Sequence, residues 1–411
     1  MRGMDLVEER QKSILIPMLG VGGTHRAVAF AVRDAIEGLA PFTYRVEVVD
    51  LASVAKAKRA EGFLKRSWDF ALSHPGIALI FNRAVDGLSP LTHSRNLLRC
   101  LFPDFTQRSI EYIRNFQPDF VFATHFFCGT LAAMARERYN LLCKVVTFMT
   151  DPFVGHRMWV DDHLDFIVAS NPIAASYLLE NGMPGEKVVT LSYPLRAQFS
   201  KVVTEEEKEK IRRAYGLDGD RLTLLFTAGE RGIGKTREYI EAICRHALPV
   251  NVIVVCGRNE ELYRFLCSLR EDSSLKTNLV ILGYVEEIRT LLAIADLSVS
   301  KAGPAITFES LACGCPLVFT HWVCLNEKGN LDFCLKEEVG FYAPDVHTFL
   351  ALLQRMMEER ELIDRCRRNI RRLRATPVLE GIERGSWRVA RWIVEQLEAS
   401  STVAGVMGGA T

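Results

Sequence analysis

A glycine-rich turn near the amino terminus carries the first candidate for chemistry. The run Gly20-Val-Gly22-Gly23-Thr-His25 follows an apolar stretch and precedes a helical pattern over residues 26–39. Glycines between a strand and a helix let a ligand approach the backbone, and a helix start favours negative charge. The spacing differs from the dinucleotide-binding pattern G-x-G-x-x-G. His25 is therefore a candidate catalytic group, and a structural cap is the alternative for it.

A second glycine-rich run, Gly229-Glu-Arg-Gly232-Ile-Gly234-Lys235-Thr236, matches the P-loop pattern and lies between an apolar strand and a helix. A P-loop nucleoside triphosphatase also needs an aspartate at the end of a neighbouring strand to hold magnesium. The expected strands after the run end in Cys256, Leu282, Ser300 and Phe319. We therefore predict that the three glycines form a cradle of backbone amides for phosphates. A P-loop ATPase or kinase is the alternative.

The elements that must position these groups alternate between short β-branched runs and helical patterns, which is typical of parallel sheets covered by helices. The expected strands are residues 13–19, 44–50, 120–124, 145–149, 166–169, 222–227, 251–256, 279–282, 297–300 and 316–319. A charged helix with a capping-box start at Thr204 interrupts the series. We predict an α/β protein with two Rossmann-like domains. Their bounds are residues 1–198, a linker at 199–220, residues 221–385, and a last helix with a loose tail at 386–411.

Composition supports two folded domains and excludes several classes of protein. The chain has 411 residues, of which 48% are hydrophobic and 25% charged, so most of it can bury a core. This excludes a disulfide-stapled miniprotein and global disorder. The 51 basic and 50 acidic residues leave a net charge of +1, so we expect no nucleic-acid partner.

Targeting signals and cysteines predict a cytoplasmic protein. Residues 1–12 lack the apolar core of a signal peptide, and no run approaches the roughly 18 apolar residues of a membrane span. The 11 cysteines are an odd number and several lie in apolar runs, which is typical of free thiols in a reducing compartment. No Cys/His group has metal-ligand spacing, so we expect no metal and no cofactor.

Four blocks of sequence occur in the order known from one enzyme family. They are Gly22-Gly23-Thr-His25-Arg-Ala; Thr150-Asp151 with His156 and Trp159; Cys256-Gly-Arg258-Asn with Gly283-Tyr284-Val285; and Lys301-Ala-Gly303-Pro through Glu309 with Asn326-Glu327-Lys-Gly-Asn330. Over most of residues 13–345 the chain resembles the GT-B glycosyltransferases that act on lipids. These include monogalactosyldiacylglycerol synthase, processive diacylglycerol glycosyltransferases and, more distantly, the lipid II N-acetylglucosaminyltransferase. The family usually carries an acidic residue at the position of Gly20.

The resemblance implies a cleft between the two domains and a donor site in the second one. The implied donor-binding residues are Gly229, Gly232, Gly234, Arg258, Tyr284, Val285, Lys301, Gly303, Glu309, Asn326, Glu327 and Asn330. The glycines would bind the diphosphate, and Glu309, placed at the end of a loop that opens a helix, would accept from the ribose hydroxyls. Glu327 and Asn330 would bind sugar hydroxyls. For Glu309 and Asn330, support of a helix terminus is the alternative.

The resemblance also implies how the sugar moves to its acceptor. His25 would assist deprotonation of the acceptor hydroxyl, with Asp151 as the alternative base. A turn-forming role before Pro152 is the alternative for Asp151. Gly22, Gly23, His156 and Trp159 would lie on the acceptor side. Lys301 or Arg258 would offset charge on the departing diphosphate without a metal.

A basic and aromatic region between residues 51 and 115 indicates what the acceptor is. Basic side chains outnumber acidic ones there, and Phe63, Trp68 and Phe81 lie among them, a mixture suited to an anionic bilayer. Amphipathic helices packed on the sheet are the alternative. With this region, the resemblance implies a hexosyltransferase that uses a UDP-sugar and a lipid acceptor, with diacylglycerol favoured, and that attaches peripherally to the inner face of the cell membrane. A UDP-sugar 2-epimerase, which shares the architecture, and a non-catalytic nucleotide-sugar or lipid-binding relative are the competing functions.

Overall fold

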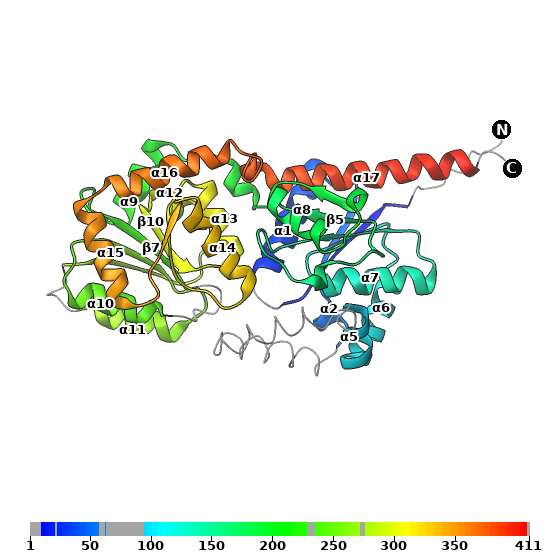
Figure 1. Cartoon of the computed structure of the whole chain (residues 1–411), viewed down its shortest axis with the longest axis horizontal. Helices are drawn as coiled ribbons and strands as arrows, with labels where there is room; N and C mark the ends of the chain where they lie inside the picture. The colour runs from blue at the N-terminus through cyan, green and yellow to red at the C-terminus, as the bar shows by residue number, and fades with distance from the viewer. Residues whose placement is uncertain are drawn as a thin grey trace, which may run out of the picture.

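The computed structural model of the chain contains two parallel sheets that lie side by side, each with helices on its faces (Figure 1). It describes residues 10–20, 23–56, 62, 94–228, 235–271 and 276–408, with side chains to residue 399. Within these residues each sheet has six strands. The predicted α/β class with two Rossmann-like sheets is confirmed.

The first sheet has the order β2-β1-β3-β4-β5-β6. Its strands are β1 (Ser13–Met18), β2 (Arg45–Asp50), β3 (Phe120–Ala123), β4 (Lys144–Phe148), β5 (Phe166–Ala169) and β6 (Val188–Thr190). The helices around it are α1 (Gly23–Leu39), α2 (Leu51–Val54), α5 (Ser94–Leu101), α6 (Pro103–Phe116), α7 (Phe126–Tyr139) and α8 (Pro172–Glu180). The inner strands β1 and β3 are buried along their whole length, because their apolar side chains meet helices on both faces.

The second sheet has the order β12-β11-β10-β7-β8-β9. Its strands are β7 (Thr223–Thr227), β8 (Asn251–Val255), β9 (Asn278–Leu282), β10 (Leu297–Lys301), β11 (Leu317–His321) and β12 (Gly340–Tyr342). Its helices are α10 (Thr236–Arg245), α11 (Glu260–Arg270), α12 (Ile288–Ile294), α13 (Pro304–Ala312), α14 (Leu325–Lys336), α15 (Val346–Glu358) and α16 (Glu361–Arg374). The predicted strands all occur, and β6 and β12 were not expected.

The segment expected to be a linker contains helix α9 (Glu205–Ala214). Its predicted capping box is present, since the Thr204 side chain accepts from the Glu207 N–H and the Glu207 side chain accepts from the Thr204 N–H. The segment packs on the second domain, where Arg289 donates to the Lys201 carbonyl at 2.8 Å.

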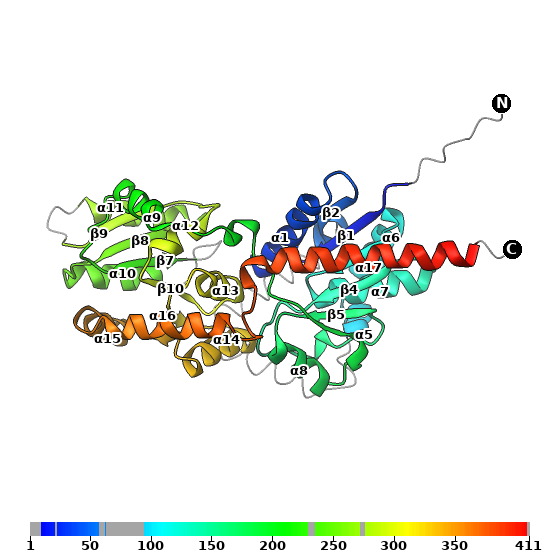
Figure 2. The same ribbon diagram turned by 90° about the horizontal axis from the view of Figure 1, so that it is seen from above.

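Helix α17 (Gly385–Gly408) returns from the second domain and lies along the first sheet beside α1 (Figure 2). It is held there by a buried apolar stripe that includes Val389, Ile393 and Leu397. The prediction of a loose tail from residue 400 is wrong as far as Gly408, because the helix continues to that residue. None of the described helices is both long and apolar enough to cross a membrane.

Candidate active site at the domain boundary

His25 lies in the first turn of α1 and is fixed by the loop that follows β3. Its Nδ1 lies 2.5 Å from the carbonyl oxygen of Thr124, and the Thr124 hydroxyl donates to the His25 carbonyl at 3.1 Å. Because a carbonyl only accepts, Nδ1 must carry the proton, and the neutral ring has its lone pair on Nε2. Burial lowers the pKa of His25, although the Thr124 carbonyl and the charge of Asp151 oppose the shift. The ring is therefore a neutral base at physiological pH.

Asp151 follows β4 and is 4% exposed. Its Oδ2 accepts from the Trp159 indole N–H at 2.7 Å, and its Oδ1 accepts from the Asn326 amide of α14 at 2.5 Å. Burial raises the pKa of Asp151, whereas these two bonds and the charge of His25 lower it. Both oxygens are occupied, and His156 Nε2 lies 3.9 Å from Oδ2. The geometry therefore suits Asp151 better for stabilising positive charge at His25 than for taking the acceptor proton.

A row of rings that the sequence did not single out connects His25 to Trp159. The His25 and His125 ring centroids are 4.7 Å apart, His125 and Phe126 are 4.1 Å apart, and Phe126 meets Trp159 edge-on at 5.4 Å. His125 Nδ1 accepts from the Phe127 N–H at the start of α7, so its proton is on Nε2. Burial lowers the pKa of His125, which keeps this neighbour of His25 uncharged. In the sequence His125 lies within an apolar run, and nothing around it predicts that it contacts His25.

The space beside Gly20 contains another acid. A Cβ at Gly20 would lie 2.5 Å from Oδ2 of Asp50, the last residue of the adjacent strand β2. The other carboxylate oxygen of Asp50 accepts from the Ala52 N–H and caps α2. A carboxylate from the neighbouring strand therefore lies beside Gly20, which no local motif could show.

The predicted sugar-binding groups of α14 are bonded to the protein itself. Glu327 is 2% exposed, forms an ion pair with Lys301 through Oε1, and accepts from the Val323 N–H at 2.9 Å through Oε2. Asn330 donates to the Ala302 carbonyl at 2.8 Å, and its buried Oδ1 has no partner among the described residues. Glu327 also lies near Gly303, where an added Cβ would be 4.0 Å from its Oε1. The structure brings these residues together where the carboxyl end of β10 meets the first half of α14.

The other predicted donor residues lie at the carboxyl ends of the second sheet. Glu309 lies in the second turn of α13, so its predicted place in the loop before the helix is wrong. Burial raises the pKa of Glu309 to about 7, against the opposing charge of Arg196. Arg258 is exposed, with its guanidinium carbon 5.6 Å from the ring centroid of Tyr284. Val285 packs on the apolar core beside that tyrosine.

The P-loop interpretation can be tested on the strands beside β7. Those strands are β8 and β10, which end in Val255 and Lys301, so neither ends in a magnesium-binding carboxylate. Lys235 donates to the Pro344 carbonyl at 2.7 Å. The predicted Gly22, Gly229, Gly232 and Gly234 lie outside the described residues. Gly23, which begins α1, has open space where a Cβ would be.

Among the described residues, one group has metal-ligand spacing: Asp161, Asp162 and His163 have ligand atoms within 4.8 Å of one another. Asp161 Oδ2 accepts from the Thr130 hydroxyl at 2.9 Å and lies 3.7 Å from Arg95. These contacts account for the carboxylate as part of an ion-pair network that attaches α5.

Two family models together match most of the chain. One is described as monogalactosyldiacylglycerol (MGDG) synthase and matches residues 25–195; the other, glycosyl transferases group 1, matches residues 207–373. The solved structure of MurG from Acinetobacter baumannii is 14% identical, with a TM-score of 0.57 over 93% of this chain and 99% of MurG. The structure of HepE from Anabaena in complex with UDP is 13% identical, with a TM-score of 0.56 over 94% of this chain and 100% of HepE. The fold and these models define a glycosyltransferase with the GT-B fold.

Curated relatives are similar to this chain over most of its length. Monogalactosyldiacylglycerol synthase 3 of Arabidopsis thaliana is 24% identical over 347 residues, which cover 81% of this chain and 72% of the relative. The processive diacylglycerol beta-glucosyltransferase of Bacillus licheniformis is 28% identical over 271 residues, which cover 65% of this chain and 68% of the relative. The chain is similar to monogalactosyldiacylglycerol synthases in its first half and to these diacylglycerol glycosyltransferases over most of its length. The predicted family, the GT-B fold and a glycosyltransferase activity are confirmed.

Proposed function

We propose that this glycosyltransferase moves a hexose from a UDP-sugar to a hydroxyl of a lipid, with diacylglycerol as the acceptor. The acceptor rests on the relatives, whose names specify galactolipid synthesis and diacylglycerol glucosylation. The donor rests on HepE, which has this fold and was solved with UDP and with UDP-glucose. The observation that carries the chemistry is the bond from His25 Nδ1 to the Thr124 carbonyl.

That bond supports a proton transfer through Nε2 of His25. With Nδ1 protonated, His25 Nε2 accepts the proton of the acceptor hydroxyl as the oxygen attacks the anomeric carbon. The bond from that carbon to the diphosphate breaks, and its electron pair leaves with UDP. The resulting imidazolium is stabilised by the Thr124 carbonyl and by the charge of Asp151, both of which favour the protonated ring.

Stabilisation of the leaving group is assigned to the second domain. Lys301 ends β10, next to β7, and its ammonium is held by the buried Glu327. His321 pairs with Lys301 in the sheet register, and burial lowers its pKa, so it is a neutral neighbour. A fixed cation at this edge offsets diphosphate charge without a metal ion, which is the metal-independent mechanism that we propose.

Access to a lipid acceptor requires contact with a membrane. In the described part of the basic and aromatic region, Arg99 is exposed and Leu101, at the end of α5, is 62% exposed. A cation beside an exposed apolar side chain suits the surface of an anionic bilayer. Phe63, Trp68 and Phe81 lie outside the described residues. We propose peripheral attachment through this face of the first domain.

The test is transfer of label from radiolabelled UDP-galactose, UDP-glucose or UDP-N-acetylglucosamine to diacylglycerol in mixed vesicles, measured in the organic phase. His25→Ala should lower the turnover by about 10²–10⁴-fold. The matched control is His246→Ala, because this histidine is exposed at the end of α10. Equal rates for the two variants would refute the assignment of the base, and chelator should leave the wild-type rate unchanged.

Three outcomes would replace the proposal. Conversion of the UDP-sugar to its epimer without acceptor would show a 2-epimerase. Magnesium-dependent ATP binding that is lost in Lys235→Ala would show a P-loop enzyme. UDP binding without transfer to any lipid of a membrane extract would show a non-catalytic relative.

A further inference from the structure

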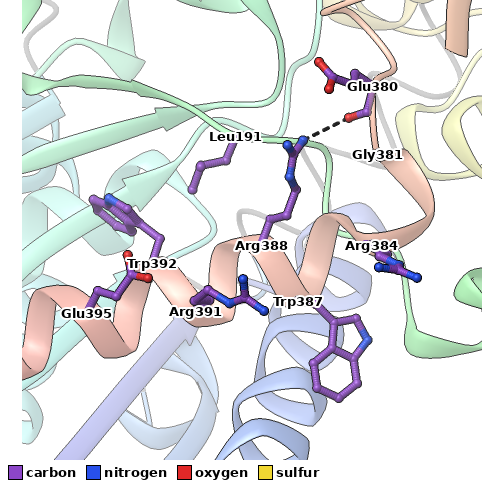
Figure 3. A pocket seen from close by; sticks show the side chains of 9 residues that line it. All are labelled: Leu191, Glu380, Gly381, Arg384, Trp387, Arg388, Arg391, Trp392 and Glu395. Atoms are coloured by element: carbon purple, nitrogen blue, oxygen red, sulfur yellow. Dashed lines mark hydrogen bonds between the residues drawn. The ribbon is translucent and has the colours of Figure 1, made fainter. Parts of the chain in front are cut away.

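A cavity of about 590 Å³ lies along the outer side of α17, where the chain crosses between the domains (Figure 3). Three sides of this α17 groove come from different segments: α17, the turn that precedes it, and the chain just after β6. The side chains on which the argument rests are Leu191, Arg384, Trp387, Arg388, Arg391 and Trp392. None of them belongs to the predicted donor or acceptor site.

Three arginines give the groove a positive stripe. Arg388 and Arg391 are spaced i and i+3 on α17 and share one face of the helix, Arg384 ends the short turn just before it, and all three are exposed. Like charges at this spacing on a helix repel each other. Among the described residues, the Arg384 and Arg391 guanidiniums have no hydrogen bond or ion pair. An anion would satisfy these donors and remove the repulsion.

The acids that line the groove do not neutralise the stripe. Glu395 lies at the far end beside Trp392, and the Glu380 carboxylate points away from Arg388 (Figure 3). Arg388 instead donates to two neutral oxygens, the Ser192 hydroxyl at 2.9 Å and the Glu380 carbonyl at 3.2 Å. Positive charge is therefore concentrated between Arg384 and Arg391.

Apolar side chains form the remaining walls. Trp387 and Trp392 are half-buried. The Trp387 ring packs closely on Gly38 of α1, and Trp392 meets Phe166 of β5 edge-on, with the ring centroids 5.5 Å apart. Leu191 lines the groove from the chain after β6. Rigid indoles beside guanidiniums fit a ligand with a charged end and an apolar part.

We propose that the α17 groove binds a phosphate ester that carries an apolar portion. The phosphate accepts from Arg384, Arg388 and Arg391, for which the planar guanidinium donors are well matched. The apolar portion lies along Trp392 and Leu191. A phospholipid head group and a soluble phosphate ester share this chemistry.

The position of the groove connects such a ligand to the arrangement of the domains. Ser192 donates to the Glu380 carbonyl at 2.8 Å, and Arg388 bonds to both residues. Ser192 belongs to the segment that leaves the first domain, and Glu380 to the segment that returns to it. A phosphate that engages Arg388 competes with the bonds that hold the two crossing segments together.

The first experiment is calorimetric titration of the full chain with octyl phosphate and with inorganic phosphate. We expect saturable binding of octyl phosphate, weaker binding of inorganic phosphate, and at least a tenfold rise in Kd in the double variant Arg384→Gln/Arg391→Gln. The control is Arg371→Gln, an exposed arginine of α16 outside the groove. No saturable binding, or an equal loss in the control, overturns the site. Equal affinity for the two probes overturns the apolar part.

Sedimentation with vesicles then identifies the source of the phosphate. Binding to phosphatidylglycerol vesicles that the double variant loses and the control keeps assigns the groove to a lipid head group. Vesicle binding that is equal in all three proteins, together with groove-dependent binding of octyl phosphate, assigns it to a soluble ester. Circular dichroism melting curves must superimpose for the three proteins, since the substituted side chains are exposed.

Discussion

The ion pair between Lys301 and Glu327 predicts a measurable loss of stability when its cation is removed. The Glu327 side chain is 3% exposed, and after Lys301→Met its carboxylate retains one bond, from the Val323 N–H. Breaking a fully buried pair costs about 3–5 kcal/mol. The Lys301 side chain is 31% exposed, so water can replace part of the ammonium, and we expect a loss of about 2–3 kcal/mol.

Thermal unfolding followed by circular dichroism measures this loss, which corresponds to about 5–10 °C in Tm for a domain of this size. Lys328→Met is the matched control, because Lys328 pairs with Asp332 on the exposed side of the same helix. That surface pair should contribute less than about 0.5 kcal/mol. The double variant Lys301→Met/Glu327→Gln removes both charges and should recover most of the stability. Equal melting of the two single variants, or no recovery in the double variant, would refute the reasoning.

Three further predictions concern the base, the close contact at Gly385 and the acid proposed for the ribose. Because burial lowers the pKa of His25 and the base must be unprotonated, kcat/KM should rise with pH to an inflection below about 6.5 and then stay level; an inflection above about pH 7 contradicts this. Gly385→Ala should lower Tm by several degrees, since its Cβ would lie 1.9 Å from the Tyr193 carbonyl oxygen, whereas Gly219→Ala has open space and should not. The pKa of Glu309 is raised from 4.5 to about 7, so its stabilising contribution is complete below pH 4.5 and is lost as pH rises through 7. Wild type should therefore lose up to about 3 kcal/mol of stability between about pH 5 and 8 that Glu309→Gln does not lose, measured by urea unfolding.

The hydrophobic pattern of the sequence was sufficient to predict most of the strands and helices of the fold. The inner strands were predicted because each is a β-branched or aromatic run of four to six residues, bounded by turn residues. The edge strands β6 (Val188–Thr190) and β12 (Gly340–Tyr342) have three residues each, too few to show a period. The continuation of α17 through residues 400–402 was missed because serine and threonine are weak helix formers.

Only part of the site could be predicted, because the roles of its residues depend on which strands are neighbours in each sheet. The P-loop match is local, whereas the test of it needs β8 and β10 beside β7. Asp50 is distant from Gly20 in sequence, and only the pairing of β1 with β2 places its carboxylate there. The motifs likewise placed Lys301 and Glu327 in one predicted site, but they did not predict that the two side chains form an ion pair with each other.

The block after β4 shows why the two halves of the site cannot be treated separately. Phe153 leaves the first domain and stacks on Phe333 of α14 at 3.9 Å. The neighbouring Val154 lies so close to Gly329 that an added Cβ there would be 2.8 Å from its side chain. The same segment holds Asp151, whose carboxylate is bonded from both domains, by Trp159 and by Asn326. A turn-forming role before Pro152 explains none of these contacts, whereas a connector between domains requires all of them. The charge that faces His25 is therefore set by domain packing, and any movement that separates α14 from this block must also change the environment of the base.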